Sequence, residues 1–273
     1  MKKYFFLLVL FFIGVSFADI KMNPNSNTYW EIKSLNQAKY QGKGVKIVNN
    51  KNSFTVSNES TSPKSGHSIR RSVPISKEYP YLEFKTTSIT PYRGYKNWSV
   101  SFRELQSSFG SITNAEPGVV VMNCFENLPK EFTKNKANLM FYFYNFKADF
   151  QYLKMVKKPD NYITVSGDFT QKKRIQSGDM VKFTVHLKDT AEEVVLKLLY
   201  KKYLYSIKVN GSETIELTPE DKEQKIWSCQ LPIKTLYSTK GKKFKRGEVL
   251  MRALVLGGSV KEPIWAPLQY SFE

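Results

Sequence analysis

The chain has 273 residues, of which 41% are hydrophobic and 14% aromatic, and this composition excludes a disordered protein. Its 42 Lys and Arg residues outnumber 24 Asp and Glu residues, which gives a formal net charge of +18 at pH 7. Such a charge favours acidic partners, for example a polysaccharide or another polyanion. Only seven of the basic residues are Arg, so the excess of Lys also fits a solubilising role.

The first 18 residues have the features of a cleavable signal peptide. Two lysines precede an apolar run from residue 4 to residue 15, and Ser16 and Ala18 stand at the −3 and −1 positions. The run is shorter than the roughly 20 apolar residues that span a bilayer, so an uncleaved anchor is the less favoured alternative. No cysteine stands directly after the cleavage point, which argues against a lipoprotein. We therefore expect a secreted, periplasmic or cell-surface protein, with no transmembrane segment in the mature chain and no nucleic-acid partner.

Beyond the signal peptide, alternating apolar and polar residues with many β-branched and aromatic side chains predict strands almost throughout. The predicted strands are Val45–Val48, Phe54–Asn58, Ser68–Pro74, Tyr81–Ile89, Trp98–Leu105, Gly118–Phe125, Leu139–Phe146, Tyr162–Ser166, Met180–Leu187, Val194–Tyr200, Tyr205–Val209, Thr214–Leu217, Ile226–Leu231, Glu248–Leu256 and Leu268–Phe272. Turn-forming residues separate these runs. Asn210-Gly211 predicts a type I′ hairpin turn, which needs a positive φ at both positions. The sequence therefore predicts an all-β protein.

Residues 170–178 are polar and basic without a hydrophobic period, and they are the predicted linker. This linker separates residues 19–169 from residues 179–273, and both parts have the usual size of a β-sandwich. Residues 190–204 are ambiguous, because Thr190 and Glu193 have capping-box spacing whereas the following apolar residues alternate as in a strand. A strand is the preferred interpretation, since both neighbouring segments are predicted strands.

Two parts of the chain resemble known families. Residues 65–71 read SGHSIRR and residues 79–84 read YPYLEF, and this N-terminal part resembles carbohydrate-binding modules of the galactose-binding jelly-roll type. The resemblance implies a β-sandwich and the ability to bind a glycan, but it supplies no ligand residues. Residues 178–187 together with the 205–217 hairpin are similar to immunoglobulin-like or fibronectin-III-like accessory domains, on strand number and length alone.

The sequence contains two cysteines, Cys124 and Cys229, and two histidines, His67 and His186. An exported protein can form a disulfide from such a pair, but both cysteines lie in apolar runs and two separate buried thiols are the preferred interpretation. His67 is expected in a turn and His186 on a strand, and neither has neighbours at metal-ligand spacing. Nucleophile-elbow, phosphate-loop and dinucleotide motifs are also absent. We therefore expect no metal, no cofactor and no catalytic site.

The aromatic segment at residues 92–98 is the candidate binding site. Proline and glycine in and before this segment predict a loop, where rings are not all buried by strand pairing. Rings can stack on the apolar faces of sugars, while arginine and asparagine bind the hydroxyl groups. The predicted ligand-binding residues are Tyr92, Arg93, Tyr95, Asn97 and Trp98. The alternative is a structural role, in which the rings cover the end of a sandwich.

These features together predict an exported, non-catalytic protein that binds a glycan or an anionic envelope polymer through the aromatic loop. Two alternatives stay open. In the first, the protein is a structural component of a surface or periplasmic assembly, with the same aromatic residues buried at a subunit contact. In the second, it is a polysaccharide-active enzyme with a carboxylate site that the sequence does not reveal. The sequence specifies neither the ligand nor the oligomeric state.

Overall fold

The structure is a computed structural model that describes residues 20–23, 26–36, 39–41, 44–59, 67–92, 97–111, 116–126, 128, 131–167, 178–200, 205–236 and 249–268. In these residues the chain forms strands and one short 3-10 helix, η2 (Ile233–Leu236), and no α-helix occurs among them. The predicted all-β class is therefore confirmed. The predicted signal peptide lies outside the described residues. Within the described part of the chain, no helix is long and apolar enough to cross a membrane.

The strands form three sheets. The largest, here called the shared sheet, contains β1 (Ile20–Met22), β2 (Thr28–Ile32), β4 (Val45–Asn49), β5 (Phe54–Asn58), β7 (Tyr81–Pro91), β10 (Gly118–Asn123), β12 (Phe146–Val156), β15 (Glu193–Tyr200), β16 (Ile215–Glu216), β19 (Val249–Leu256) and β20 (Ile264–Leu268). The second sheet contains β3 (Lys39–Gln41), β6 (His67–Pro74), β8 (Asn97–Phe102), β9 (Ser107–Ser111) and β11 (Lys136–Tyr144). The third contains β13 (Tyr162–Gly167), β14 (Met180–His186), β17 (Thr218–Pro219) and β18 (Ile226–Pro232).

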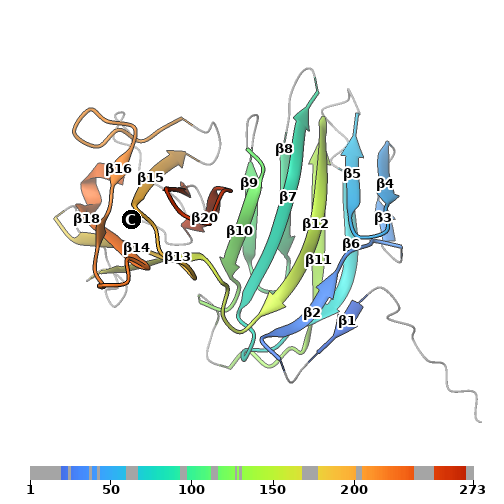
Figure 1. Cartoon of the computed structure of the whole chain (residues 1–273). Helices are drawn as coiled ribbons and strands as arrows, with labels where there is room; N and C mark the ends of the chain where they lie inside the picture. The colour runs from blue at the N-terminus through green and yellow to red at the C-terminus, as the bar shows by residue number, and fades with distance from the viewer. Residues whose placement is uncertain are drawn as a thin grey trace, which may run out of the picture.

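The shared sheet runs through both halves of the molecule, in the order β1-β2-β12-β7-β10-β20-β19-β15-β16, with β4 and β5 attached beside β12 (Figure 1). Its centre is a short parallel ladder between β10 and β20, in which Val119 pairs with Ile264 and Val120 with Trp265. Val120 and Trp265 belong to one hydrophobic core, whereas Ile264 belongs to another. Because alternate side chains of a strand point to opposite faces, the two cores lie on opposite faces of this sheet.

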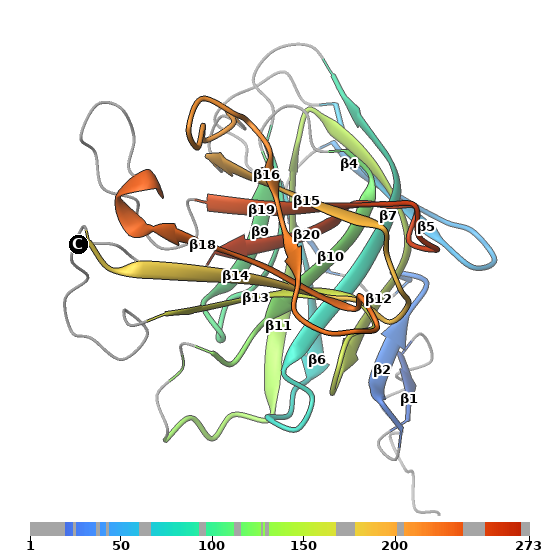
Figure 2. The ribbon, with the colours of Figure 1, turned by 60° about the vertical axis from the view of Figure 1, so that its left-hand side comes forward.

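Each core is closed by a different small sheet. The second sheet covers the half of the shared sheet that contains β7 and β12, and this first sandwich encloses a core rich in phenylalanine. The third sheet covers the half that contains β15 and β19, and this second sandwich encloses an aliphatic core. Figure 2 brings the second sandwich forward, with β13, β14 and β18 beside β15, β19 and β20. The two sandwiches are therefore offset, each on its own side of one continuous sheet.

The predicted boundary between the two halves needs correction. β13 pairs with β14 and places Ile163 in the second core, so the change from the first core to the second precedes Tyr162. It does not occur at the predicted linker, residues 170–178, nearly all of which lie outside the described residues. The chain also returns through β20 to the first sandwich, and the predicted parts 19–169 and 179–273 are joined by hydrogen bonds between strands. The jelly-roll and immunoglobulin-like assignments stay predictions.

A β-bulge in β12 changes which residues of this strand face the core. The register between β12 and β7 shifts around Phe150, and Gln151 is the extra residue. Before the bulge, even-numbered residues such as Phe150 are buried, whereas Leu153 and Met155 are buried after it. The bulge therefore turns Tyr152, together with Lys154, to the outer face. From the sequence alone, no strand is predicted between Phe146 and Tyr162, and the bulge breaks the alternation in the second half of this segment.

Other local predictions can now be compared with the structure. Residues 193–200 form strand β15 and not a helix, as preferred. Asn210 and Gly211 have φ angles of 50° and 85°, which confirms the type I′ turn. The segment 205–209 forms only isolated bridges and is not a strand, and His67 begins β6 and does not lie in a turn. Both cysteines are free, as preferred.

Candidate functional site

The predicted aromatic loop does not form a platform among the residues that the structure describes. Tyr92 follows β7, and its backbone N–H donates to the carbonyl of Asn145 at 2.8 Å. Burial and the nearby Glu59 raise the pKa of the Tyr92 hydroxyl. Asn97 is half-buried at the start of β8 and pairs with Tyr144 of β11. The other two polar and aromatic candidates, Arg93 and Tyr95, lie outside the described residues.

Trp98 is a core residue, which corrects its assignment as a stacking residue. Only 1% of its surface is exposed, and its ring packs against Phe109 and Phe143 with centroid separations of 5.4 and 5.8 Å. The physical reason is its position on β8, where Trp98, Val100 and Phe102 alternate toward the first core. A bound sugar cannot reach this ring.

A cleft lies instead at the seam between the two sandwiches, where β13 lies against β20 of the shared sheet. We call it the seam cleft; it is a shallow depression that is partly open to solvent. Its buried lining is apolar and consists of Val121, Ile163, Met251, Ala266, Pro267 and Leu268. Its more exposed lining includes Tyr81, Asn123, Glu126 and Thr164. An apolar floor with a few polar groups at the rim is typical of small-molecule sites.

Aromatic rings continue from this cleft over the edge of the third sheet. The ring centroids of Tyr81 and Tyr162 lie 5.9 Å apart. The Tyr162 ring stacks on His186, with a centroid separation of 4.4 Å and an interplanar angle of 6°. Thr164 fixes the imidazole through a 3.0 Å hydrogen bond between its Oγ1 and His186 Nε2. The three rings therefore form a row held by β7, β13 and β14.

Burial keeps this row uncharged near neutral pH. Burial raises the pKa of the Tyr81 hydroxyl, and the neighbouring Tyr162 and Glu126 raise it further. Burial also raises the pKa of Tyr162. The pKa of His186 is lowered, first by burial and then by the positive charge of Lys158. A row of neutral rings is suited to contact with apolar faces of a ligand.

A buried carboxylate lies beside the cleft on the outer face of the first sandwich. Glu83 of β7 is directly opposite Val121 in the register and is only 4% exposed. Its Oε1 atom accepts a hydrogen bond from the Tyr152 hydroxyl at 2.7 Å and lies 2.8 Å from Lys154 Nζ. Its Oε2 atom is buried and has no hydrogen-bond partner. These residues, together with the ion pair between Lys85 and Glu262 at 2.5 Å, are called the Glu83 network.

The Glu83 network depends on the bulge in β12, because that bulge brings Tyr152 and Lys154 to the same face as Glu83. Burial and the Glu83 carboxylate raise the pKa of the Tyr152 hydroxyl, so this group stays a hydrogen-bond donor. The network therefore presents one carboxylate with a spare acceptor atom, next to a cleft with a ring-lined rim. Bulges are frequent beside functional sites, where they redirect side chains in this way.

Sequence reasoning missed this site, although part of its signal is visible. The alternation in β7 places Tyr81, Glu83 and Lys85 on one face, and an acidic residue between an aromatic and a basic residue on a predicted strand is a usable signal. The pairing of β10 with β20 and the position of β13 could not be read from periodicity. Both arise from contacts between segments far apart in the chain.

The described residues contain no cluster of His, Cys, Asp or Glu side chains arranged for a metal ion. Burial raises the pKa of both cysteine thiols to about 11, which leaves them protonated near neutral pH. Neither thiol therefore has the character of a nucleophile. The seam cleft is thus a candidate for binding through rings, hydroxyl groups and carboxylates.

No protein family and no curated protein matches the sequence. Solved structures to which this chain shows a weak similarity include the glycoside hydrolase domain of Endo-D from Streptococcus pneumoniae R6, at 9% identity and a TM-score of 0.30, with the match covering 85% of this chain and 37% of that chain. A DUF4785 family protein from Legionella pneumophila is 13% identical, with a TM-score of 0.26, and the match covers 87% of this chain and 64% of that chain. The N-terminal domain of the Streptococcus gordonii adhesin Sgo0707 is 8% identical, with a TM-score of 0.22, and the match covers 89% of this chain and 80% of that chain. The chain spans less than two thirds of the first two of these proteins.

Proposed function

We propose that this chain is a non-catalytic binding protein that holds a short stretch of a glycan in the seam cleft. The observation that carries the proposal is the position of the Tyr81 ring at an apolar cleft, next to the polar side chains of Asn123 and Thr164. The ring of Tyr162 extends this aromatic surface, with its centroid 5.9 Å from that of Tyr81. A sugar has apolar C–H faces that pack on rings, and hydroxyl groups that need donors and acceptors. The cleft offers both kinds of contact within one concave surface.

The buried carboxylate supports recognition of hydroxyl groups. The unpartnered Oε2 atom of Glu83 would gain a hydrogen bond from a donor that reached it, such as a bridging water or a sugar hydroxyl. The amide of Asn123 and the exposed carboxylate of Glu126 add further groups at the rim. A neutral or weakly charged glycan suits this mixture of acceptors and rings.

Binding fits the described carboxylates better than hydrolysis does. Glycoside hydrolysis needs one carboxylic acid that donates a proton and a second carboxylate roughly 5–9 Å away across the scissile bond. Glu83 is engaged by Lys154 and Glu262 by Lys85, so each of these two carboxylates already has a positively charged neighbour. An ion-paired carboxylate is a poor proton donor.

The proposal is tested by isothermal titration of the full chain with a panel of neutral and acidic oligosaccharides. Replacing the cleft tyrosine and its aromatic neighbour, Tyr81→Ala and Tyr162→Ala, should weaken the binding of the best ligand by about tenfold or more, since each lost ring contact is worth roughly 0.5–1.5 kcal/mol. Tyr205→Ala is the matched control, because this ring is 69% exposed and does not line the cleft. It should bind as the wild type does.

Two outcomes would contradict the proposal. One is unchanged affinity of the double variant, with thermal unfolding showing that it is folded. The other is a loss of affinity confined to Tyr92→Ala, which would return the site to the aromatic loop. Light scattering tests the assembly alternative, since a discrete oligomer that dissociates in the double variant would place these rings at a subunit contact.

A further inference from the structure

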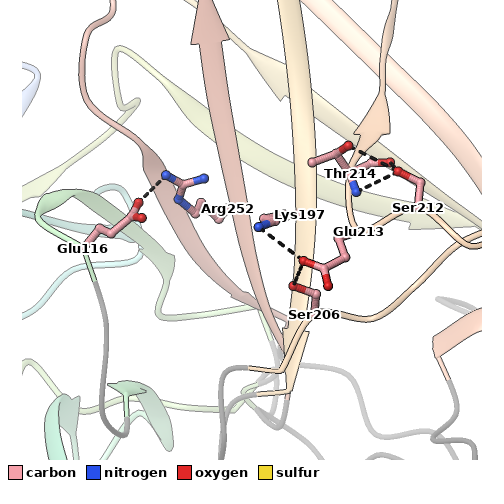
Figure 3. A network of polar contacts seen from close by, with 7 residues as sticks. All are labelled: Glu116, Lys197, Ser206, Ser212, Glu213, Thr214 and Arg252. Carbon is pink, nitrogen blue, oxygen red and sulfur yellow. Dashed lines mark hydrogen bonds and ion pairs between the residues drawn. The ribbon is translucent and has the colours of Figure 1, made fainter.

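The opposite face of the shared sheet carries a second polar network beside the seam. Here β20, β19 and β15 lie side by side, and Trp265, Arg252 and Lys197 are directly paired across them. Two carboxylates reach these cations, Glu116 at Arg252 and Glu213 at Lys197, as Figure 3 shows. We call this set of side chains the Arg252 network.

Arg252 is held in place but is not saturated with hydrogen bonds. Its guanidinium carbon lies 5.8 Å from the centroid of the Trp265 ring, and Nη2 donates to the Glu116 carboxylate. The Nε–H group of Arg252 is buried and has no acceptor, and the Nε1–H group of Trp265 is in the same condition. Trp265 is only 3% exposed. Buried donors without acceptors are rare and each is costly, so these two indicate a missing acceptor.

The backbone of β10 packs closely against the indole N–H group. A Cβ atom at position 118 would lie 3.3 Å from Trp265 Nε1, and position 118 is a glycine. Gly118 begins β10, two residues after Glu116. Glycine therefore allows β10 to lie directly against Trp265 and the carbonyl of Pro263, and this packing holds the indole in place beside Arg252.

The chemistry of Arg252 favours a carboxylate ligand. A guanidinium group binds a carboxylate best through two parallel N–H donors, whereas Glu116 is bonded to Nη2 and leaves Nε without an acceptor. The Glu116 side chain is 58% exposed, so its ion pair is weak and exchange with another carboxylate has a small cost. The ammonium group of Lys197 lies on the adjacent strand, where it is paired at 3.8 Å with Glu213, a carboxylate that is itself half exposed.

We propose that the Arg252 network is a second binding site, which takes one carboxylate group of an acidic polysaccharide, and that Glu116 occupies the site when no ligand is present. The incoming carboxylate accepts hydrogen bonds from Nε and Nη2 of Arg252, and Glu116 moves away into solvent. The net charge of +18 attracts such a polymer. Ser206, which donates to Glu213 at 3.1 Å, provides a nearby hydroxyl for the sugar part. This site goes beyond the proposed function, since the seam cleft lies on the other face of the sheet.

The test uses a galacturonate oligomer and its methyl ester, which has the same shape but no charge. Titration calorimetry with the full chain should show that the acid binds about tenfold more tightly than the ester. Arg252→Gln should remove most of that difference, and Arg252→Lys should also lose much of it because the ammonium group lacks the paired donors. Glu116→Gln should tighten binding of the acid several-fold, because the internal competitor loses its charge.

Lys225→Gln is the control for the loss of one positive charge, since Lys225 is paired with Glu223 at a different surface. It should leave the affinity for the acid nearly unchanged. Equal affinity for the acid and the ester, or weaker binding by Glu116→Gln, would overturn the proposal. Equally tight, Arg252-dependent binding of an oligoglutamate would overturn the assignment to a polysaccharide. The Tyr81→Ala and Tyr162→Ala variant should retain this site, so failure of the seam cleft can be told apart from failure here.

Discussion

The Glu83 and Arg252 networks occupy opposite faces of one sheet and differ in the charge that they bury. On the face of the first network, a carboxylate is buried and keeps one acceptor atom without a partner. On the face of the second, a guanidinium group is largely buried and keeps one donor without a partner. The first face is thus suited to hydroxyl groups and the second to carboxylates. Both sites arise from the same feature of the fold, the offset between two sandwiches that share one sheet.

The difference also lies in how each ion pair is shielded from water. The Glu83 side chain is 5% exposed and Lys154 21%, whereas the carboxylate partners in the Arg252 network are more than half exposed. Desolvated ion pairs are strongly destabilising when broken, and exposed ones contribute little. Removing one partner from the Glu83 network should therefore destabilise the fold, while the Arg252 network should remain free to exchange partners.

The largest expected effect follows from breaking one ion pair in each network. Lys154→Met leaves the buried Glu83 carboxylate without its counter-ion and should lower the free energy of unfolding by about 3 kcal/mol, measured by urea denaturation near neutral pH. Lys197→Met is the matched change on the other face, and it should cost less than about 1 kcal/mol because Glu213 is 51% exposed. Equal losses would remove the distinction between the networks.

A double variant shows whether the loss at Lys154 comes from the unpaired charge. Glu83→Gln combined with Lys154→Met removes both charges and should recover part of the stability lost by Lys154→Met alone. If the double variant is less stable than both single variants, packing of the lysine side chain is the better explanation.

An intermediate effect on stability is expected at Gly118, in the strand β10 that pairs with β20 and joins the two sandwiches. A Cβ atom here would stand 2.4 Å from the carbonyl oxygen of Pro263, so Gly118→Ala should force β10 away from β20 and cost about 2 kcal/mol. Gly178→Ala is the control, because no atom lies within 4 Å of its added Cβ. Thermal unfolding of the two variants measures the difference. A Gly118→Ala protein as stable as Gly178→Ala would show that the sandwiches are not joined through this ladder.

The smallest expected effect is a pH dependence confined to the seam side. The pKa of folded His186 is lowered by burial and by Lys158, with Glu220 acting in the opposite direction, so the unfolded chain binds the proton more readily. The contribution of neutral His186 to the free energy of unfolding should therefore be fully present above the unfolded pKa of about 6.5. It should be lost as the pH drops below this value toward the folded pKa. In urea titrations, the free energy of unfolding of His186→Gln should fall less between pH 7 and pH 5 than that of the wild type. Identical pH profiles for the two proteins would contradict this role of His186.

The alternation of side chains was sufficient to predict most of the strands and the all-β class. Phe54–Asn58 is found with the predicted bounds, and Tyr162–Ser166 and Val194–Tyr200 differ from the observed strands by one residue. All of β12 after its first residue, Phe146, was missed, and the bulge at Gln151 breaks the period in its second half. The joining of two sandwiches through β10 and β20 could not be predicted, since a two-residue ladder between distant segments leaves no local pattern.

The candidate site was harder to predict than the fold, and Trp98 shows why. A ring in a segment with proline and glycine has the composition of an exposed loop, yet Trp98 lies on the strand that follows and packs into the first core. Tyr81 and Tyr162 look like ordinary strand residues in the sequence. They meet at the seam only because β13 crosses beside the shared sheet. Exposure at a junction depends on tertiary contacts, which the sequence pattern does not contain.

The most direct test of the account is a backbone amide NMR titration of the full chain with the oligosaccharide that binds best in calorimetry. Binding in the seam cleft predicts that the largest shift changes occur at Tyr81, Asn123 and Thr164, on three strands from both sandwiches. Shift changes concentrated at Tyr92 and Asn97, with the cleft residues unaffected, would contradict the account and restore the aromatic loop as the binding site.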